Sequence, residues 1–598
     1  MKNRFLQTFT VSVLLIALIA VAGCKKYTKV EAASLYSISQ AFADVSNATI
    51  AVIGVYDELM GYETYGQFVS TEFPYDSDEG YQEGDIDNGR RGIGRYQFTI
   101  SNSDMRDAFR SLYRGVERAN LCIEQIPLMP QYTKGSEVEK TDLQRLYGEA
   151  LTLRAQFLFE LIRNWGDVPA PLIPAYKQTS LFIGQTDRDS TYDRIIADLA
   201  VAKDLLPWRT LVPKNERITK GTAKALRARI ALFRGGYSLR SNAQMERRPD
   251  FLKYYQIAKD ECAELIANRA QHTLNPSFEN IWRDLTSFKV DSYGERVFEV
   301  GEGGATESLL GFVNGPILSN ASRYGAAFGG TRMMPSYFYA FDSVDTRRDV
   351  TITFYRVASS TNIKSVRRLG EITSGKFRRD WRVPLLPGTQ QSPGFNWVLI
   401  RFSDVLLMYA EAANEINNGP DPLAITSLEE VRKRAFKNNP IGTTPTDKAG
   451  FFNAIVNERF LEFGEEGIRK YDLIRWNLLA TKIAETRIKL QQIRDRVAPY
   501  DYVPEYVYFK NAGEEITWYT GSANLNTQPF WRPQQTPSPI TGWSEVSWSA
   551  HLKSNVIDGK PLYQAFAGFF VTGKSELMPY DQGTLDSYQG ALKQNPGY

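Results

Sequence analysis

The residues whose types and spacing best suit chemistry lie in one loop-rich stretch, 73–102, where carboxylates, tyrosines and arginines alternate. A tyrosine ring can stack on the apolar face of a sugar ring or a peptide side chain, and neighbouring acidic and guanidinium groups can hydrogen-bond the polar rim of the same ligand. The stretch therefore predicts a binding site. Its candidate ligand-binding residues are Tyr75, Asp78, Tyr81, Arg90, Arg91 and Tyr96.

Two further loop-rich stretches can contribute to the same kind of site, because long loops on a rigid scaffold are where binding residues concentrate. The stretch 275–396 offers Tyr293 and Tyr324 as additional stacking residues, and it holds strand-like runs at 296–300 and 350–355. The stretch 497–596 carries four of the ten tryptophans. Tryptophans gathered among Pro, Gly and Ser need either a local core or a ligand.

The first stretch also carries acidic side chains at positions 76, 78, 79, 83, 85 and 87. Hard oxygen ligands on a flexible loop are what a calcium ion requires. The EF-hand spacing fails, however, because Gly80 stands where a ligand belongs. We therefore expect a solvated acidic loop offset by the nearby arginines and no bound metal, with calcium left open as an alternative on ligand type alone.

Histidine is scarce, which weighs against enzyme chemistry. Only His272 and His551 occur among 598 residues, so a catalytic triad or a multi-histidine metal site is hard to assemble. The run 568–575 fits the letters of a phosphate-binding loop, but its Phe-Phe-Val-Thr interior favours a strand, and Pro579 leaves little room for the helix that such a loop needs. We predict no catalytic residue and no cofactor. Paired carboxylates that hydrolyse a glycosidic bond remain the enzyme alternative.

The N-terminus has the pattern of an export signal. Lys2 and Arg4 precede an apolar run at 9–22 that is too short to span a bilayer, and small residues lead to Cys24. This pattern resembles a bacterial lipobox, so we predict a lipoprotein signal peptide at 1–23 and lipidation of Cys24. Acyl chains would then hold the mature protein at a membrane surface. The two other cysteines, Cys122 and Cys262, fall in helical patterns and are expected to be buried thiols.

The segments that must position the loops are predicted to be helices. Apolar residues recur every three or four positions at 109–126, at 143–157 and in further segments up to position 479. Helices joined by short connections pack antiparallel, as in tetratricopeptide hairpins, although no clean 34-residue period is visible. The predicted fold is mostly α: one domain at 24–598, built as a tetratricopeptide-like helical-hairpin scaffold with loop-rich insertions at about 73–102, 275–396 and 497–596 and a few short strands.

The composition of the chain limits the kinds of partner molecule that we expect. The chain is 43% hydrophobic and carries 71 Lys and Arg against 68 Asp and Glu, so it can bury a large core and has no strong net field. A polyanion such as nucleic acid is therefore not an expected partner.

Several motifs together resemble the SusD/RagB family of outer-membrane nutrient-binding lipoproteins, over nearly the whole mature chain. They are GEA at 148–150, LRA at 153–155, NWGDVP at 164–169, KALRAR at 224–229, RFSDVLLMYAEA at 401–412, NERxxEFxxEGxRxxDLxRW at 457–476 and QNPGY at 594–598. The segment after Trp476 is longer than usual for the family. Lys25 and Lys26 also stand where surface-exported members tend to carry acidic residues.

The resemblance implies a surface-exposed outer-membrane lipoprotein that captures oligosaccharides, or less often peptides, for a TonB-dependent SusC-like transporter, without catalysis. The Ser77-Asp78-Glu79 run is similar to a family signature beside the ligand site, which favours the first stretch. Arg475 and Trp476 look structural. Two other classes stay open, namely a surface glycoside hydrolase and a helical scaffold that binds only protein.

Overall fold

The computed structural model describes residues 37–212, 214–303, 308–519, 529–531 and 540–598. The signal peptide expected at 1–23 and the lipidation site Cys24 lie outside this range, so both remain predictions. Within the described ranges, no helix combines the length and the apolar character needed to cross a membrane.

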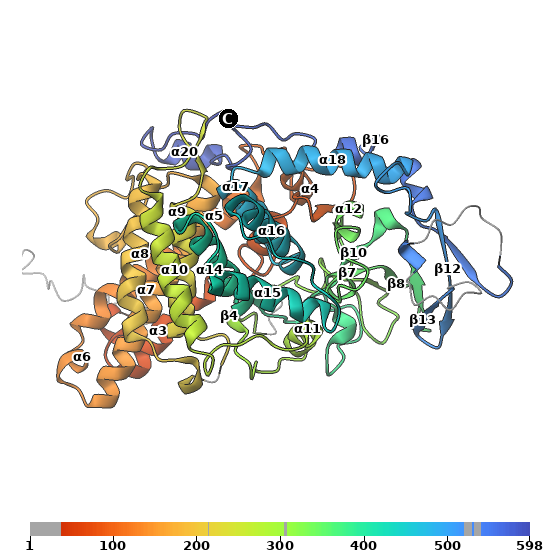
Figure 1. The fold of residues 1–598 in the computed structure, drawn as a ribbon. Helices are drawn as coiled ribbons and strands as arrows, with labels where there is room; N and C mark the ends of the chain where they lie inside the picture. The colour runs from red at the N-terminus through yellow and green to blue at the C-terminus, as the bar shows by residue number, and fades with distance from the viewer. Residues whose placement is uncertain (1–36, 213, 304–307, 520–528, 532–539) are drawn as a thin grey trace, which may run out of the picture.

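Long helices form one half of the molecule, on the left in Figure 1. They are α3 (Val45–Asp57), α5 (Ser103–Gln125), α7 (Glu137–Trp165), α8 (Arg188–Leu205), α9 (Lys220–Arg234), α10 (Phe251–Ala267), α14 (Phe402–Ile416), α15 (Pro422–Phe436) and α16 (Lys448–Glu462). Helix α5 packs on α7, and α7, α8, α9, α10, α14 and α15 then pack each on the next. This stack of neighbouring helices confirms the predicted mostly helical, hairpin-based scaffold.

Helix α7 shows why the sequence folds this way. Ser136 and Glu139 form a capping box that satisfies the first free amides of the helix. Apolar side chains at three- and four-residue spacing then face the core, and Phe157 among them is fully buried. Helices α5 and α7 approach closely because a Cβ on Gly115 would lie only 2.4 Å from Phe157 Cζ.

Short strands and loops form the other half, mostly on the right in Figure 1, whereas β4 lies below α14 near the middle. The strands are β1 (Gly80–Gln82), β6 (Thr331–Met333), β10 (Thr373–Ser374) and β7 (Ile352–Thr353) in one sheet, β5 (Ile317–Leu318), β8 (Tyr355–Val357) and β9 (Lys364–Val366) in a second, β4 (Arg296–Val300) with β11 (Trp397–Arg401), and β13 (Glu515–Trp518), β12 (Tyr506–Ala512) and β14 (Ser544–Ser547) in another. The strand expected at 296–300 is confirmed as β4, and the run at 350–355 contributes to β7 and β8. The chain also forms helices α11 (Phe278–Thr286), α17 (Arg469–Arg475) and α18 (Leu479–Asp495), and α17 packs on α18.

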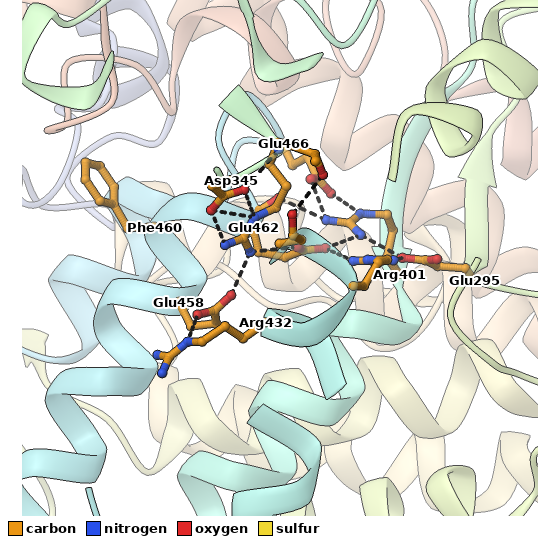
Figure 2. A network of polar contacts seen from close by, with 12 residues as sticks. Glu295, Asp345, Arg401, Arg432, Glu458, Phe460, Glu462 and Glu466 are labelled. Atoms are coloured by element: carbon orange, nitrogen blue, oxygen red, sulfur yellow. Dashed lines mark hydrogen bonds and ion pairs between the residues drawn. The ribbon is translucent and has the colours of Figure 1, made fainter. Parts of the chain in front are cut away.

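Buried ion pairs join the two halves (Figure 2). Arg401, at the end of β11, donates to Glu295 at 2.9 Å, to Glu462 at 2.7 Å and to Glu466 at 2.7 Å. The Arg401 side chain has no exposed surface, and Glu462 lies on helix α16 of the scaffold. A buried arginine of this kind is tolerated only because its charge and its donors are matched.

Arg347 extends the same network. Its guanidinium pairs with Asp345 at 2.7 Å, with Glu458 at 2.6 Å and with Glu462 at 3.1 Å. Burial alone would raise the pKa of Glu462, but Arg434, Arg401 and Arg347 hold that pKa below its ordinary value. The Glu462 carboxylate therefore stays charged inside the protein.

The signature at 457–476 continues into a second cluster of paired charges. Arg475 donates to Glu411 at 2.8 Å and to Asp472 at 2.8 Å, and the Trp476 indole donates to Glu411 at 2.9 Å. The interpretation of Arg475 and Trp476 as structural residues is confirmed. Cys122 and Cys262 are buried free thiols, as expected.

Candidate functional site

Three of the candidate tyrosines are buried beneath the first loop. Tyr75, Tyr81 and Tyr96 are 1%, 4% and 3% exposed. The Tyr96 hydroxyl donates to the carbonyl of Asp76 at 2.6 Å, and the Tyr81 hydroxyl donates to the carbonyl of Gly370 at 2.9 Å. Burial raises the pKa of Tyr75, Tyr81 and Tyr96. The sequence led us to expect these rings to face a ligand, whereas the structure packs them inside, where no ring face is open to stacking.

Asp78 also points inward. Its two carboxylate oxygens accept hydrogen bonds from Arg469 at 2.8 Å and 2.7 Å, and only 6% of the residue is exposed. Arg469 begins helix α17, so this bidentate pair ties the first loop to the signature stretch. The Ser77-Asp78-Glu79 run thus holds the loop in place, and a ligand contact by Asp78 stays a prediction that its burial does not support.

Four of the six acidic residues that suggested calcium, namely Asp78, Glu83, Asp85 and Asp87, are engaged with other groups, whereas carboxylate oxygens of the buried Asp76 and Glu79 have no hydrogen-bond partner among the residues that the structure describes. Glu83 pairs with Arg332. One carboxylate oxygen of Asp87 accepts amides at the start of helix α4 (Arg90–Gly94), and Asp85 accepts the amide of Asp558 at 3.0 Å. Over the described ranges of the chain, no group of three or more His, Cys, Asp or Glu side chains is arranged to hold a metal ion.

Arg90 is the candidate that reaches an exposed aromatic surface. Its Cζ lies 5.6 Å from the ring centroid of Phe328, whose side chain is 43% exposed. The rings of Phe328 and Phe312 stack with centroids 6.4 Å apart and an angle of 30° between their planes. We call the three side chains of Arg90, Phe312 and Phe328 the Phe328 platform.

Backbone pairing brings the parts of the platform together from distant positions. Strand β1 pairs antiparallel with β6, which sets Gln82 opposite Thr331. The Arg90 guanidinium donates to the Gln82 side chain and, at 3.4 Å, to the carbonyl of Gly330. A Cβ on Gly330 would lie 2.4 Å from the Phe328 ring and 3.1 Å from Arg90 Nη1, so only glycine leaves room for both groups.

The platform combines an apolar face with fixed polar donors. Burial lowers the pKa of Arg90 and the nearby Glu72 carboxylate opposes that change, so the guanidinium is partly desolvated. An exposed phenyl face can stack on the C–H face of a sugar ring, and the neighbouring guanidinium can hydrogen-bond its hydroxyl groups. The arrangement suits binding, and its three side chains include no acid, base or nucleophile for catalysis.

The other three candidates lie apart from the platform. Arg91 donates to the carbonyl of Asp85 at 2.9 Å, within its own loop. The Tyr324 hydroxyl donates to Glu514 at 2.7 Å, and only 7% of Tyr324 is exposed. Tyr293 is 39% exposed, but its carbonyl accepts the amide of Thr273, on the loop that follows α10. None of these contacts involves Arg90, Phe312 or Phe328, and the ligand roles of the three residues remain predictions.

Sequence reasoning missed Phe312 and Phe328, because an isolated phenylalanine in a long loop gives no sign of its exposure. The available signal was the set of glycines around Phe328, at positions 325, 329 and 330. Glycines on both sides of one aromatic residue indicate a tightly turned backbone. The run 568–575 forms turns with no helix at Lys574, unlike a phosphate-binding loop.

The fold and the platform define a class of protein: a stack of helical hairpins that presents a loop-borne aromatic surface. A family described as "SusD family" matches residues 339–598, and one described as "Starch-binding associating with outer membrane" matches residues 80–232. The chain belongs to the SusD family, which confirms the resemblance drawn from its motifs.

Relatives and solved structures agree over most of the chain. The SusD-like protein P25 of Formosa agariphila is 24% identical over 518 residues, which cover 80% of this chain and 92% of the relative. A SusD homolog from Bacteroides thetaiotaomicron superposes with a TM-score of 0.73 at 22% identity, covering 93% of this chain and 97% of the other. Surface glycan-binding protein A from the same organism, solved with laminarihexaose, gives a TM-score of 0.61 at 17% identity over 92% of this chain and 99% of the other.

Proposed function

We propose that this protein captures oligosaccharides on the Phe328 platform and passes them to a SusC-like TonB-dependent transporter, while acyl chains on Cys24 anchor it on the outer surface of the outer membrane. The observation that carries the proposal is the exposed face of Phe328, backed by Phe312 and flanked by Arg90. A SusD-fold protein solved with laminarihexaose supports a glycan ligand. Membership of a family whose members include outer-membrane starch binders supports the location.

Capture of this kind binds the ligand through noncovalent contacts and breaks none of its covalent bonds. Covering the phenyl ring with the apolar face of a sugar stabilises the complex by about 25 cal/mol per Å² of apolar surface removed from water, and the guanidinium adds directional hydrogen bonds. Because the platform contributes no carboxylate pair, the ligand should leave it intact.

The test compares Phe328→Ala with a matched control, Phe182→Ala, in the mature chain solubilised in detergent. Phe182 is 48% exposed on the helical half, so its loss removes a similar exposed ring away from the platform. Binding to a panel of glycans and peptides is measured by calorimetry, and the recovered ligands are analysed for cleavage.

We expect saturable glycan binding that Phe328→Ala weakens about tenfold, equal to about 1.4 kcal/mol, and that Phe182→Ala leaves unchanged. Equal affinities of wild type and Phe328→Ala would overturn the platform as the site. If only peptides bind, the ligand is a peptide and not a glycan. If the recovered ligand is cleaved, the protein is a hydrolase.

A further inference from the structure

A cavity of about 480 Å³ that shares no lining residue with the platform opens between helix α11, the turn at 343–346, the segment 354–364 and strand β13. Four aromatic residues line it, namely Phe354, Tyr355, Trp381 and Trp518. Its volume falls within the range of small-ligand sites, which are typically about 300–1,000 Å³. Part of its wall comes from the C-terminal stretch that the sequence left without a role.

The aromatic wall is held rigidly. The Tyr355 hydroxyl donates to Asp380 at 2.5 Å. Arg378 lies with its Cζ 4.4 Å from the ring centroid of Trp381 and donates to the carbonyls of Gly375 at 2.9 Å and Ile352 at 3.0 Å. A wall whose side chains are fixed before binding loses little conformational entropy when a ligand enters.

Long-range contacts attach strand β13 to the rest of the cavity. Glu514, at the β12–β13 turn, accepts from Tyr324 at 2.7 Å and from Arg323 at 2.6 Å. The Asn511 amide donates to the carbonyl of Lys364 at 2.8 Å. Trp518 then packs against Phe354 with ring centroids 5.6 Å apart. The C-terminal hairpin therefore closes one side of the cavity.

The charges at the rim are paired and leave acidic oxygens accessible. The pairs are Arg283 with Glu279 at 2.5 Å, Lys364 with Glu515 at 2.9 Å and Arg348 with Asp349 at 2.7 Å. The side chains of Glu279, Asp349 and Glu515 are 45%, 45% and 76% exposed, and those of Arg283 and Lys364 are 46% and 14% exposed. Exposed carboxylates accept hydrogen bonds from hydroxyl groups, and the exposed Arg283 guanidinium donates them.

We propose that this cavity is a second, independent binding site for sugar units. Phe354 and Trp518, the two wall aromatics that are not fully buried, pack against the sugar ring, and the charged groups at the rim exchange hydrogen bonds with its hydroxyl groups. The choice of ligand class rests on the proposed glycan function, whereas the existence of a second site rests on the cavity alone.

Tryptophan fluorescence separates the two sites, because Trp381 and Trp518 line the cavity and the platform has no tryptophan. The mature chain in detergent is titrated with laminarihexaose, a neutral glycan. Val344 lines the cavity and is 38% exposed, so Val344→Arg is the blocking variant. Val138→Arg, at a position 71% exposed on α7, is its control.

We expect a saturable fluorescence change with the neutral ligand that persists in Phe328→Ala, disappears in Val344→Arg and is unchanged in Val138→Arg. A signal that survives Val344→Arg, or one that Phe328→Ala removes, overturns the second site and leaves the platform standing. Calorimetric binding that Val344→Arg abolishes and Phe328→Ala does not touch overturns the platform and leaves the second site. No binding in the wild type overturns both.

Discussion

The stretch at 457–476 and the Phe328 platform are built on opposite principles. The first is buried and charged: Glu462 and Arg475 are almost fully enclosed and paired on several sides. The second is exposed and largely apolar, and it rests on one phenylalanine whose ring is held by neighbouring backbone. Residues that make the family recognisable thus specify architecture, while the proposed ligand contacts are few and carry no family signature. Membership of the family therefore predicts the scaffold, whereas the ligand has to be inferred from the side chains exposed on the platform.

The largest effect is expected from removing one charge from the buried network around Arg401, which we call the junction. This change tests whether the buried charges set the stability of the fold. Arg401→Met leaves Glu295, Glu462 and Glu466 buried without their shared partner, so the free energy of unfolding should fall by about 3–5 kcal/mol. Chemical denaturation measures the loss. Lys433→Met, which removes an exposed pair with Glu429, should cost less than about 0.5 kcal/mol. Similar losses in the two variants would mean that burial does not set the value of these pairs.

A second substitution separates a structural role from a ligand role in the first loop. Asp78→Asn weakens the bidentate contact with Arg469, and the free energy of unfolding should fall by about 2–3 kcal/mol. Glycan affinity of the folded protein should not change. Asp107→Asn, at an exposed pair with Arg106, serves as the control. If Asp78→Asn lowered the glycan affinity and left the free energy of unfolding unchanged, Asp78 would be a ligand-binding residue.

A third prediction concerns pH. Burial, and then the neighbouring Asp78 carboxylate, raise the pKa of Glu79 from 4.5 to about 8. Between these values the unfolded chain releases a proton that the folded protein keeps, so this group lowers stability as pH rises from 4.5 to 8. Glu79→Gln removes that penalty and should raise the free energy of unfolding by about 1–2 kcal/mol at pH 8, with no gain at pH 4.

Denaturation of wild type and Glu79→Gln at both pH values measures this difference. Glu485→Gln, at a side chain 40% exposed, should show the same small effect at pH 4 and pH 8. A gain for Glu79→Gln that is equal at the two pH values would show that the Glu79 carboxyl is not held neutral by the fold.

The smallest expected effect comes from a substitution that tests the geometry of the platform. In Gly330→Ala the new methyl group must displace the Phe328 ring or Arg90, so glycan affinity should fall about three- to tenfold, equal to about 0.7–1.4 kcal/mol. Gly184→Ala is the control, because the nearest atom to its Cβ would be 3.4 Å away. Calorimetry follows both variants. Unchanged affinity in Gly330→Ala would separate ligand binding from the geometry of the Phe328 ring.

Much of the scaffold could be predicted from sequence because its signals are local. The apolar spacing at 143–157 lies within helix α7, and the five-residue run at 296–300 is strand β4. Periodicity of this kind needs no knowledge of distant residues. The tryptophan-rich stretch was predicted to need a core or a ligand. Its Trp548 is fully buried against Phe338 and Phe530, so a local core accounts for that residue.

The site was harder to predict because it depends on long-range pairing. Composition could not tell that Tyr81 faces inward while Arg90 reaches the surface, since both belong to the same polar, aromatic loop. Their placement follows from the pairing of β1 with β6, which lie about 250 positions apart in the sequence. The same pairing, together with the absence of a side chain at Gly330, places Phe328 next to Arg90.

The ion pairs at the junction also have a mechanical consequence. Arg401 joins β11 to helix α14, Arg347 and Glu466 lie outside the scaffold helices, and Glu462 lies on α16, so several buried contacts would have to open together before these loops could leave the scaffold. Bending at this point would expose charges in an interior that cannot solvate them. The buried pairs therefore couple these loops rigidly to the helices.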